Sequence, residues 1–237
     1  MLGALVRIIL SVALGSVQPT MNTDSRVTTL IVDNDAWVRR GMKDILEATP
    51  DIVVVAEAED GDQVPAKVTR FRPHVVLMDL KMVRVGGLEA TRQLMLMPNP
   101  PKVIAMTAFD VDGLVIEAVE AGAHSFMRKD AAPEAFQQAV RVVASDHALF
   151  SRDSLRAIAE STPREPVRDQ TALAVLTDRE REVLVQLATG LGNGEIAERM
   201  YLGETTIKSH VSSLFSKLGV NNRVRASLVA YRCGLVV

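Results

Sequence analysis

Five short apolar runs, separated by stretches with helical spacing, constrain the fold of this chain more than any other feature. They cover residues 27–32, 52–56, 75–78, 103–106 and 124–127. Each run is nearly continuous and rich in Val, Ile or Met, which is typical of parallel strands that are buried on both faces. The intervening segments carry apolar residues at helical spacing, such as Leu114, Ala118 and Ala121. Five strand-helix units of this kind predict a doubly wound α/β domain with a five-stranded parallel sheet.

The remainder of the chain predicts a second, all-α domain. We place the α/β domain at residues 27–146, a linker with two prolines at residues 147–172, and the all-α domain at residues 173–237. Thr177 and Glu180 have the spacing of a helix capping box. No strand-like run follows, so we expect helices over residues 178–188, 194–200, 205–218 and 222–232, with Asn193 capping the second.

The first 26 residues need a separate interpretation. Residues 2–17 are apolar apart from Arg7 and small residues, and they resemble the core of a signal peptide more than a membrane span. We expect residues 1–26 to be a disordered or non-native extension, with translation starting at Met21. A peripheral membrane anchor is the alternative. Cys233 is the single cysteine and cannot form an internal disulfide, so a reducing cytoplasm is expected.

Composition excludes a disordered chain and gives a weak charge signal. Apolar residues make up 48% of the 237 residues and charged residues make up 24%. Residues 171–237 contain eight Lys and Arg against six Asp and Glu, whereas the whole chain has a formal net charge of -2. Because this basic excess is small, it indicates nucleic-acid binding only if a DNA-binding motif accompanies it.

Polar side chains follow four of the five expected strands, at the edge where open parallel sheets bind ligands. They are Asp33, Asn34 and Asp35 after the first strand, Asp79 after the third, Thr107 after the fourth and Lys129 after the fifth. A carboxylate such as Asp79 can attack a phosphoryl group, and Asp33 with a neighbour can bind a hard divalent cation. Thr107 and Lys129 can hold phosphate oxygens. Each residue alone is more typical of a cap or a solvated surface, but their convergence favours magnesium-dependent phosphoryl transfer.

Residues 201–203 form a short connection between two expected helices, as in a helix-turn-helix. In that motif the second helix enters the major groove of DNA. Its apolar positions are Ile207, Val211, Leu214 and Leu218, which leaves outward positions at Thr205, Lys208, Ser209 and Ser212. By itself the pattern is equally typical of a small helical bundle with a solvated Lys208.

Four blocks resemble the receiver domains of two-component response regulators. They are Val32-Asp33-Asn34-Asp35, Leu77-Met78-Asp79-Leu80, Met106-Thr107-Ala108 and Phe126-Met127-Arg128-Lys129. The resemblance implies a flavodoxin-like fold and a sensor histidine kinase that donates a phosphoryl group to Asp79. It implies a magnesium site formed by Asp33, Asn34, Asp79 and the backbone carbonyl of Lys81. It also implies phosphoryl contacts from Thr107 and Lys129, and switch roles for Thr107 and Phe126.

The all-α domain resembles the LuxR-type domain of the NarL/FixJ response regulators over its whole length. The resemblance rests on residues 176–184 and 193–200, on Thr206-Ile207-Lys208-Ser209-His210-Val211 and on Lys217-Leu218-Gly219-Val220. It implies a homodimer that binds double-stranded promoter DNA, with RNA polymerase as a further partner and no membrane association. The implied groove-facing residues are Lys208, Ser209 and Ser212, and the implied DNA-backbone contacts are Thr205, Thr206 and Arg223.

Two departures from the receiver pattern leave alternatives open. Asn34 stands where receivers commonly have a second acid, and Val83 stands where they commonly have proline. The loss of the acid weakens the expected magnesium site, and the orientation of Asp35 is open. The leading interpretation is a DNA-binding response regulator, not an enzyme, in which phosphorylation of Asp79 controls dimerisation and transcription-factor activity. The alternatives are a degenerate, phosphorylation-independent receiver serving as a dimerisation or ligand-sensing module, and a phosphatase, for which the short loops leave little room.

Overall fold

The computed structural model describes residues 26–108, 112–146 and 173–236. The chain divides into two compact units at a boundary between Ser145 and Asp146. The predicted start at Met21 and the predicted linker at residues 147–172 lie outside the described residues. Among the helices that are described, none combines the length and the apolarity needed to cross a bilayer.

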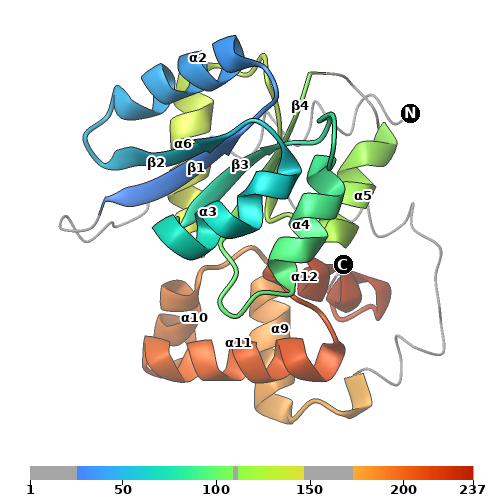
Figure 1. Cartoon of the computed structure of the whole chain (residues 1–237). Coiled ribbons are helices and arrows are strands. Elements are labelled where there is room, and N and C mark those ends of the chain that lie inside the picture. The colour runs from blue at the N-terminus through green and yellow to red at the C-terminus, as the bar shows by residue number, and fades with distance from the viewer. Residues whose placement is uncertain (1–25, 109–111, 147–172, 237) are drawn as a thin grey trace. The chain divides into compact units, whose positions relative to one another are not determined.

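The first unit is an α/β domain built on one parallel sheet (Figure 1). In chain order its elements are β1 (Val27–Val32), α2 (Ala36–Glu47), β2 (Ile52–Ala58), the 3-10 helix η1 (Gly61–Gln63), α3 (Val64–Phe71), β3 (Val75–Asp79), α4 (Gly87–Met95), β4 (Lys102–Thr107), α5 (Asp112–Ala121), β5 (Ser125–Arg128) and α6 (Pro133–Ala144). The strand order is β2-β1-β3-β4-β5, and all neighbouring strands are parallel. This confirms the predicted doubly wound fold with five strands.

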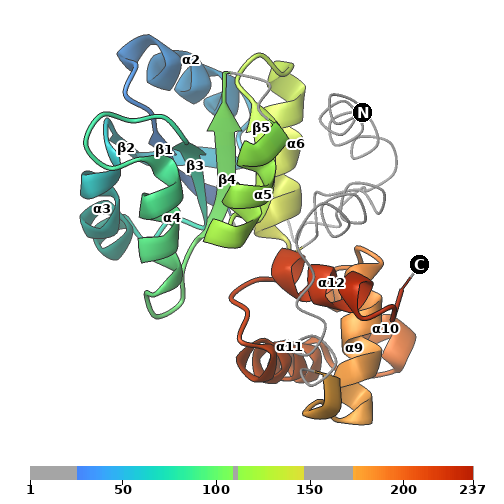
Figure 2. The ribbon, with the colours of Figure 1, turned by 90° about the vertical axis from the view of Figure 1, so that its right-hand side faces the viewer.

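Helices cover both faces of the sheet, which explains why the apolar runs are continuous (Figure 2). On one face, Leu30 of β1 and Met78 of β3 belong to a buried cluster with side chains of α3 and α4. The intervening residues, Ile31 and Leu77, are fully buried on the opposite face, where α2 and α6 pack. A side chain on either face of these strands therefore meets the hydrophobic core.

Four strands differ from the prediction by one or two residues at an end: β3 extends to Asp79 and β4 covers Lys102–Thr107. β2 continues to Ala58, because its last residues still pair with the end of β1. β5 begins at Ser125 and not at the predicted residue 124. His124 instead bonds to Val103 twice, since its backbone N–H donates to the Val103 carbonyl (2.7 Å) and its Nδ1 accepts from the Val103 N–H (3.2 Å).

The second unit is helical in its described residues. It contains α9 (Asp178–Ala188), α10 (Asn193–Met200), α11 (Glu204–Leu218) and α12 (Arg223–Arg232), which confirms the predicted all-α domain. The predicted cap of α10 is wrong, because the N-cap is Gly192 and the Asn193 side chain accepts a hydrogen bond from Arg223 instead. α11 starts one residue earlier than predicted. The core includes Val183, Leu184, Leu187, Ile196, Ile207 and Leu214, all fully buried.

Glu180 connects the start of α9 to the C-terminal half of α11. The predicted capping box is present, since the Thr177 N–H donates to Glu180 Oε2 (2.8 Å) and the Glu180 N–H donates to Thr177 Oγ1 (3.3 Å). From α11, the Lys217 ammonium lies 2.7 Å from Glu180 Oε2, and Ser213 Oγ donates to Oε1 at 2.6 Å. Lys217 and Ser213 lower the pKa of the buried Glu180 carboxyl to about 2, so this group stays ionised at neutral pH.

We expect this carboxylate to make the second unit sensitive to acid. Because the folded-state pKa is depressed, the stabilisation is complete above the ordinary value of 4.5 and is lost as the pH falls toward 2. Glu180→Gln should lower the free energy of unfolding at neutral pH by about 2 kcal/mol and flatten that part of the pH profile. Urea unfolding measures both effects. Glu182→Gln is the control, because its carboxylate is half-exposed and pairs with Arg179; an equal loss in both variants would contradict the assignment.

Candidate functional site

Four of the predicted site residues lie at the carboxyl edge of the sheet. Asp33 follows β1, Asp79 ends β3, Thr107 ends β4 and Lys129 follows β5. The Lys129 ammonium lies 2.6 Å from Asp33 Oδ2 and 3.0 Å from Asp79 Oδ2. The Lys129 N–H donates to the Thr107 carbonyl at 2.8 Å, which fixes the lysine backbone beside β4. The structure therefore brings together a buried pair of carboxylates, one ammonium group and the end of β4.

The charges in this pocket depend on one another. Burial raises the pKa of the Asp79 carboxyl above its ordinary value, and Lys129 opposes that shift. For Lys129, burial alone would lower the pKa, but Asp33 and Asp79 outweigh it and raise the pKa of the ammonium. The lysine therefore stays protonated and supplies the positive charge that the two carboxylates need.

Asp33 and Asp79 also fit a divalent cation. Both carboxylates already share one cationic group, so they are close enough to share a metal ion. Within the described part of the chain, Asp33 Oδ2 accepts no hydrogen bond besides its ion pair with Lys129. Among the described residues, no group of three or more His, Cys, Asp or Glu side chains is placed to bind a metal, so a metal here would have two carboxylate ligands. Magnesium is commonly held by one or two carboxylates with water and substrate oxygens. The donor set therefore fits magnesium.

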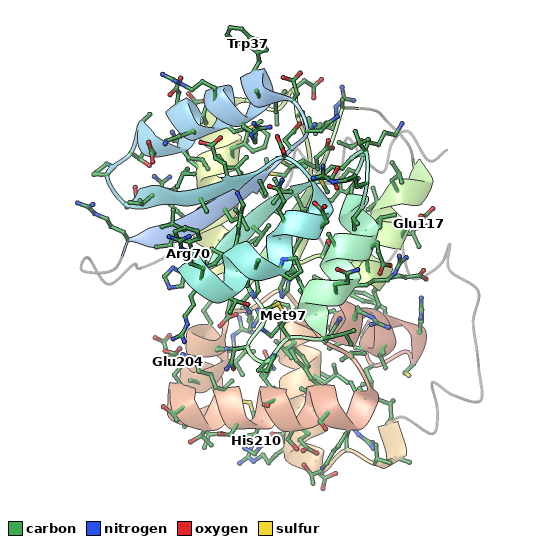
Figure 3. All side chains as sticks on the ribbon, in the orientation of Figure 1. Trp37, Arg70, Met97, Glu117, Glu204 and His210 are labelled. Carbon is green, nitrogen blue, oxygen red and sulfur yellow. The ribbon has the colours of Figure 1, made fainter. Side chains whose placement is uncertain are left out.

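The two residues after Asp33 differ in what they do. Asp35 caps α2, because its Oδ1 accepts from the Trp37 N–H (2.8 Å), and its own N–H donates to Asp33 Oδ1 (3.0 Å). Asn34 is exposed. Asp35 thus supports Asp33 and is not turned toward the carboxylate pair as a ligand. The Trp37 side chain projects from the first turn of α2 and is 86% exposed (Figure 3).

The two predicted switch residues are both buried. Thr107 is 1% exposed at the end of β4, and Phe126 is 3% exposed on the neighbouring strand β5. A buried side chain moves only if its neighbours repack. A movement of the Thr107 side chain would therefore require side chains of β5 to repack.

The helix-turn-helix of the second unit has the predicted exposed face. α10 ends at Met200 and is followed by its C-cap Tyr201, which adopts a left-handed conformation (φ 54°). Gly203 caps α11 without a side-chain hydrogen bond. The predicted DNA-contacting residues of α11 are all exposed: Thr205, Thr206, Lys208, Ser209 and Ser212. Figure 3 shows Glu204 and His210 on the same helix. Lys208 Nζ lies 2.8 Å from Glu204 Oε1, and this contact raises the pKa of the lysine.

Arg223 does not share this exposed face. Its guanidinium donates to the Leu191 carbonyl (3.0 Å) and to Asn193 Oδ1 (2.9 Å), and the residue is 6% exposed. Burial lowers its pKa to about 10. These contacts hold the connection between α9 and α10 against the start of α12, so the structure argues against the predicted DNA-backbone contact.

Asp60 was missed by the sequence analysis. It is 3% exposed, and its carboxylate accepts hydrogen bonds from backbone amides of the loop that follows Asp79. The Asp60-Gly61 pair after β2 is a turn signal, but it does not reveal which loop the carboxylate contacts.

Known proteins resemble both units. Residues 29–141 match the response regulator receiver domain, and residues 174–230 match the bacterial regulatory proteins of the luxR family. The chain is 35% identical to the uncharacterized transcriptional regulatory protein YxjL of Bacillus subtilis, covering 91% of this chain and 100% of that protein. It is 34% identical to the nitrate/nitrite response regulator NarP of Escherichia coli, covering 84% and 92%. A solved LuxR-family response regulator from an Aurantimonas species matches with a TM-score of 0.52 and 29% identity, covering 57% of this chain and 97% of that one.

We expect Asn34→Asp to strengthen magnesium binding. A carboxylate at this exposed position next to Asp33 would add one negative charge, worth about 1 to 2 kcal/mol toward a divalent ion in solvent-like surroundings. The same charge should make the metal-free variant less stable, because it is placed beside a like charge. Magnesium titration and thermal melts with and without metal measure the two effects. Asn99→Asp, the same change at an exposed position outside the predicted site, is the control; equal magnesium affinity in both variants would remove Asn34 from the metal site.

Proposed function

This chain belongs to the response regulators that join a receiver domain to a LuxR-type DNA-binding domain, and from that membership we propose that phosphorylation of Asp79 controls its binding to promoter DNA. The observation that carries the proposal is the Lys129 ammonium shared by Asp33 and Asp79. It gives a buried carboxylate a fixed position and a neighbouring cation at the edge of the sheet. Carboxylates in this setting are suited to accept a phosphoryl group.

The transfer would proceed from a phosphohistidine of a sensor histidine kinase. An Asp79 carboxylate oxygen attacks phosphorus, the bond from phosphorus to the donor nitrogen breaks, and an acyl phosphate forms. Bound magnesium would screen the repulsion between the carboxylate and the incoming phosphoryl group. Asp33, Asp79 and the Lys81 carbonyl would hold the ion, with Asn34 as a weak neutral neighbour. Lys129 and the Thr107 hydroxyl would bind the phosphoryl oxygens.

The output would be a dimer on DNA. A phosphoryl group at Asp79 would draw Thr107 toward it, and Phe126, which is buried on the neighbouring strand β5, would repack. We infer that this change favours a homodimer in which two α11 helices reach adjacent major grooves, so the operator should have twofold symmetry. The partners are then the histidine kinase, double-stranded promoter DNA and RNA polymerase, and the chain itself would act in the cytoplasm.

Labelling with radioactive acetyl phosphate tests the proposal. We expect a stable label in the presence of magnesium and none in Asp79→Asn, because the amide is not a nucleophile. Asp44→Asn is the matched control, since that carboxylate is 68% exposed on α2 and should leave labelling unchanged. A wild-type protein that takes no label would favour the phosphorylation-independent receiver. Multiple turnover of a phosphoester would favour a phosphatase.

We expect Lys208→Ala to weaken DNA binding. The loss should be about 1 to 3 kcal/mol on the operator alone if the lysine contacts a base, or a salt-dependent loss on every sequence if it contacts phosphate. Fluorescence anisotropy at several salt concentrations, with operator and random DNA, separates the two cases. Lys43→Ala, which removes a lysine from the receiver unit, is the matched control. Unchanged affinity of Lys208→Ala for all DNA would remove this residue from the interface.

A further inference from the structure

The loop that follows Asp79 donates three backbone amides to one carboxylate, that of Asp60, which lies two residues after β2. Asp60 Oδ2 accepts from the N–H groups of Val83 (3.2 Å) and Arg84 (2.9 Å), and Oδ1 accepts from the N–H of Val85 (2.8 Å). Three consecutive amides therefore converge on one side chain that is 3% exposed. Hydrogen bonds from amides to a carboxylate are stronger than those between neutral groups.

Gly87, at the end of this loop, and Gly61, in η1, are both packed too tightly against their neighbours for a side chain. A Cβ added to Gly87 would lie 2.0 Å from the Asp79 carbonyl oxygen, and one added to Gly61 would lie 2.4 Å from the Val85 carbonyl oxygen. The Gly87 N–H also donates to the Leu80 carbonyl at 3.1 Å. The loop is thus in close contact with the start of α4 on one side and with η1 on the other.

Val83 is held through its backbone and not through its side chain. Its side chain is 82% exposed, whereas its N–H points to the buried carboxylate. Proline at this position would have no N–H to donate. Val83, which stands where receivers commonly have proline, therefore makes a hydrogen bond that proline could not make.

The Asp60 carboxylate is kept ionised by these contacts. Burial alone would raise its pKa, but the amides of Arg84 and Val85 outweigh burial and lower it. The Arg84 guanidinium lies 4.0 Å from Asp60 and makes closer contacts to Asp62, at 2.8 Å and 3.0 Å. Asp62 thus binds the same loop through the exposed Arg84 side chain and accepts no hydrogen bond from the amides of residues 83–85. It is therefore the matched control for Asp60.

We propose that Asp60 is a positioning residue for phosphoryl transfer to Asp79, because it fixes the path of the loop that carries Lys81. The Lys81 N–H donates to Asp79 Oδ1 at 3.3 Å, and the first anchored amide, that of Val83, lies two residues further on. Releasing the amides would let the Lys81 backbone move relative to the carboxylate pair. This inference rests on the proposed function, since it concerns the same phosphoacceptor and the same metal site.

Three variants of the full chain test the proposal: Asp60→Ala, Asp60→Asn and Asp62→Asn. Asp60→Ala removes both acceptor oxygens, Asp60→Asn keeps one, and Asp62→Asn removes an equal charge outside the amide contacts. We expect the rate of labelling by acetyl phosphate to fall about ten- to a hundredfold in Asp60→Ala and by less in Asp60→Asn, with no change in Asp62→Asn. Magnesium affinity should also fall most in Asp60→Ala, less in Asp60→Asn and not at all in Asp62→Asn. Amide hydrogen exchange at residues 83–85 should be fastest in Asp60→Ala, slower in Asp60→Asn and unchanged in Asp62→Asn.

The outcomes separate this inference from the proposed function. If wild type is labelled and Asp60→Ala is labelled at the same rate, Asp60 does not position the site. If wild type takes no label, the proposed function fails, and equal magnesium affinity in wild type and Asp60→Ala would then overturn the positioning role. If Asp60→Ala does not fold by circular dichroism, Asp60→Asn decides. Faster exchange at residues 83–85 with unchanged labelling and metal binding would also overturn the proposal, because Asp60 would then only stabilise the loop.

Discussion

Burying Asp33 beside Asp79 is the unfavourable step on which the receiver site depends. Each carboxylate loses hydration, and the two like charges repel each other. The ammonium of Lys129 offsets both costs. Lys129 follows β5, and β4 separates that strand from β3, which ends with Asp79, and from β1, which precedes Asp33. A long side chain is needed to cross this distance. The site therefore forms only when β1, β3, β4 and β5 lie side by side in the sheet, in that spatial order.

The charge balance also explains why a metal ion suits this pocket. Two carboxylates and one ammonium leave a formal charge of minus one, and the phosphoryl group of an approaching donor would bring about two more negative charges before transfer consumes the charge of the Asp79 carboxylate. Lys129 cannot neutralise that sum alone, so a divalent cation has a clear electrostatic role. Asn34 is exposed and uncharged, so unlike a second acid it adds no negative charge next to Asp33. The same neutrality lowers the repulsion that Asp33 and Asp79 must overcome without metal.

The sequence predicts the elements that depend on local patterns. Continuous apolar runs predicted the strands, and the residues just after them predicted Asp33, Asp79, Thr107 and Lys129 at one edge, because parallel strands end on the same side. The sequence could not predict partners that are far apart along the chain. Asp60 binds amides more than twenty residues away, and backbone donors have no residue type to recognise.

Arg223 shows the same limit in the helical domain. The family resemblance implied a DNA-backbone contact for Arg223, but its guanidinium donates to Leu191 and Asn193 within the fold. Asn193 had been predicted to be a helix cap instead. Arg and Asn are as suited to these internal contacts as to surface ones, so residue type alone does not decide between them. The exposed face of α11 was predictable because its buried residues follow a helical period.

The two halves of α11 differ in their contacts. Ser213 and Lys217, in its C-terminal half, bind the buried Glu180 and fix the helix against α9. The N-terminal half presents hydroxyl groups and Lys208, whose charge is offset by Glu204. A face with so little net positive charge gains little from counterion release, so sequence-independent binding by one copy should be weak. If the chain binds DNA as the proposed homodimer, its affinity then depends on pairing two such faces.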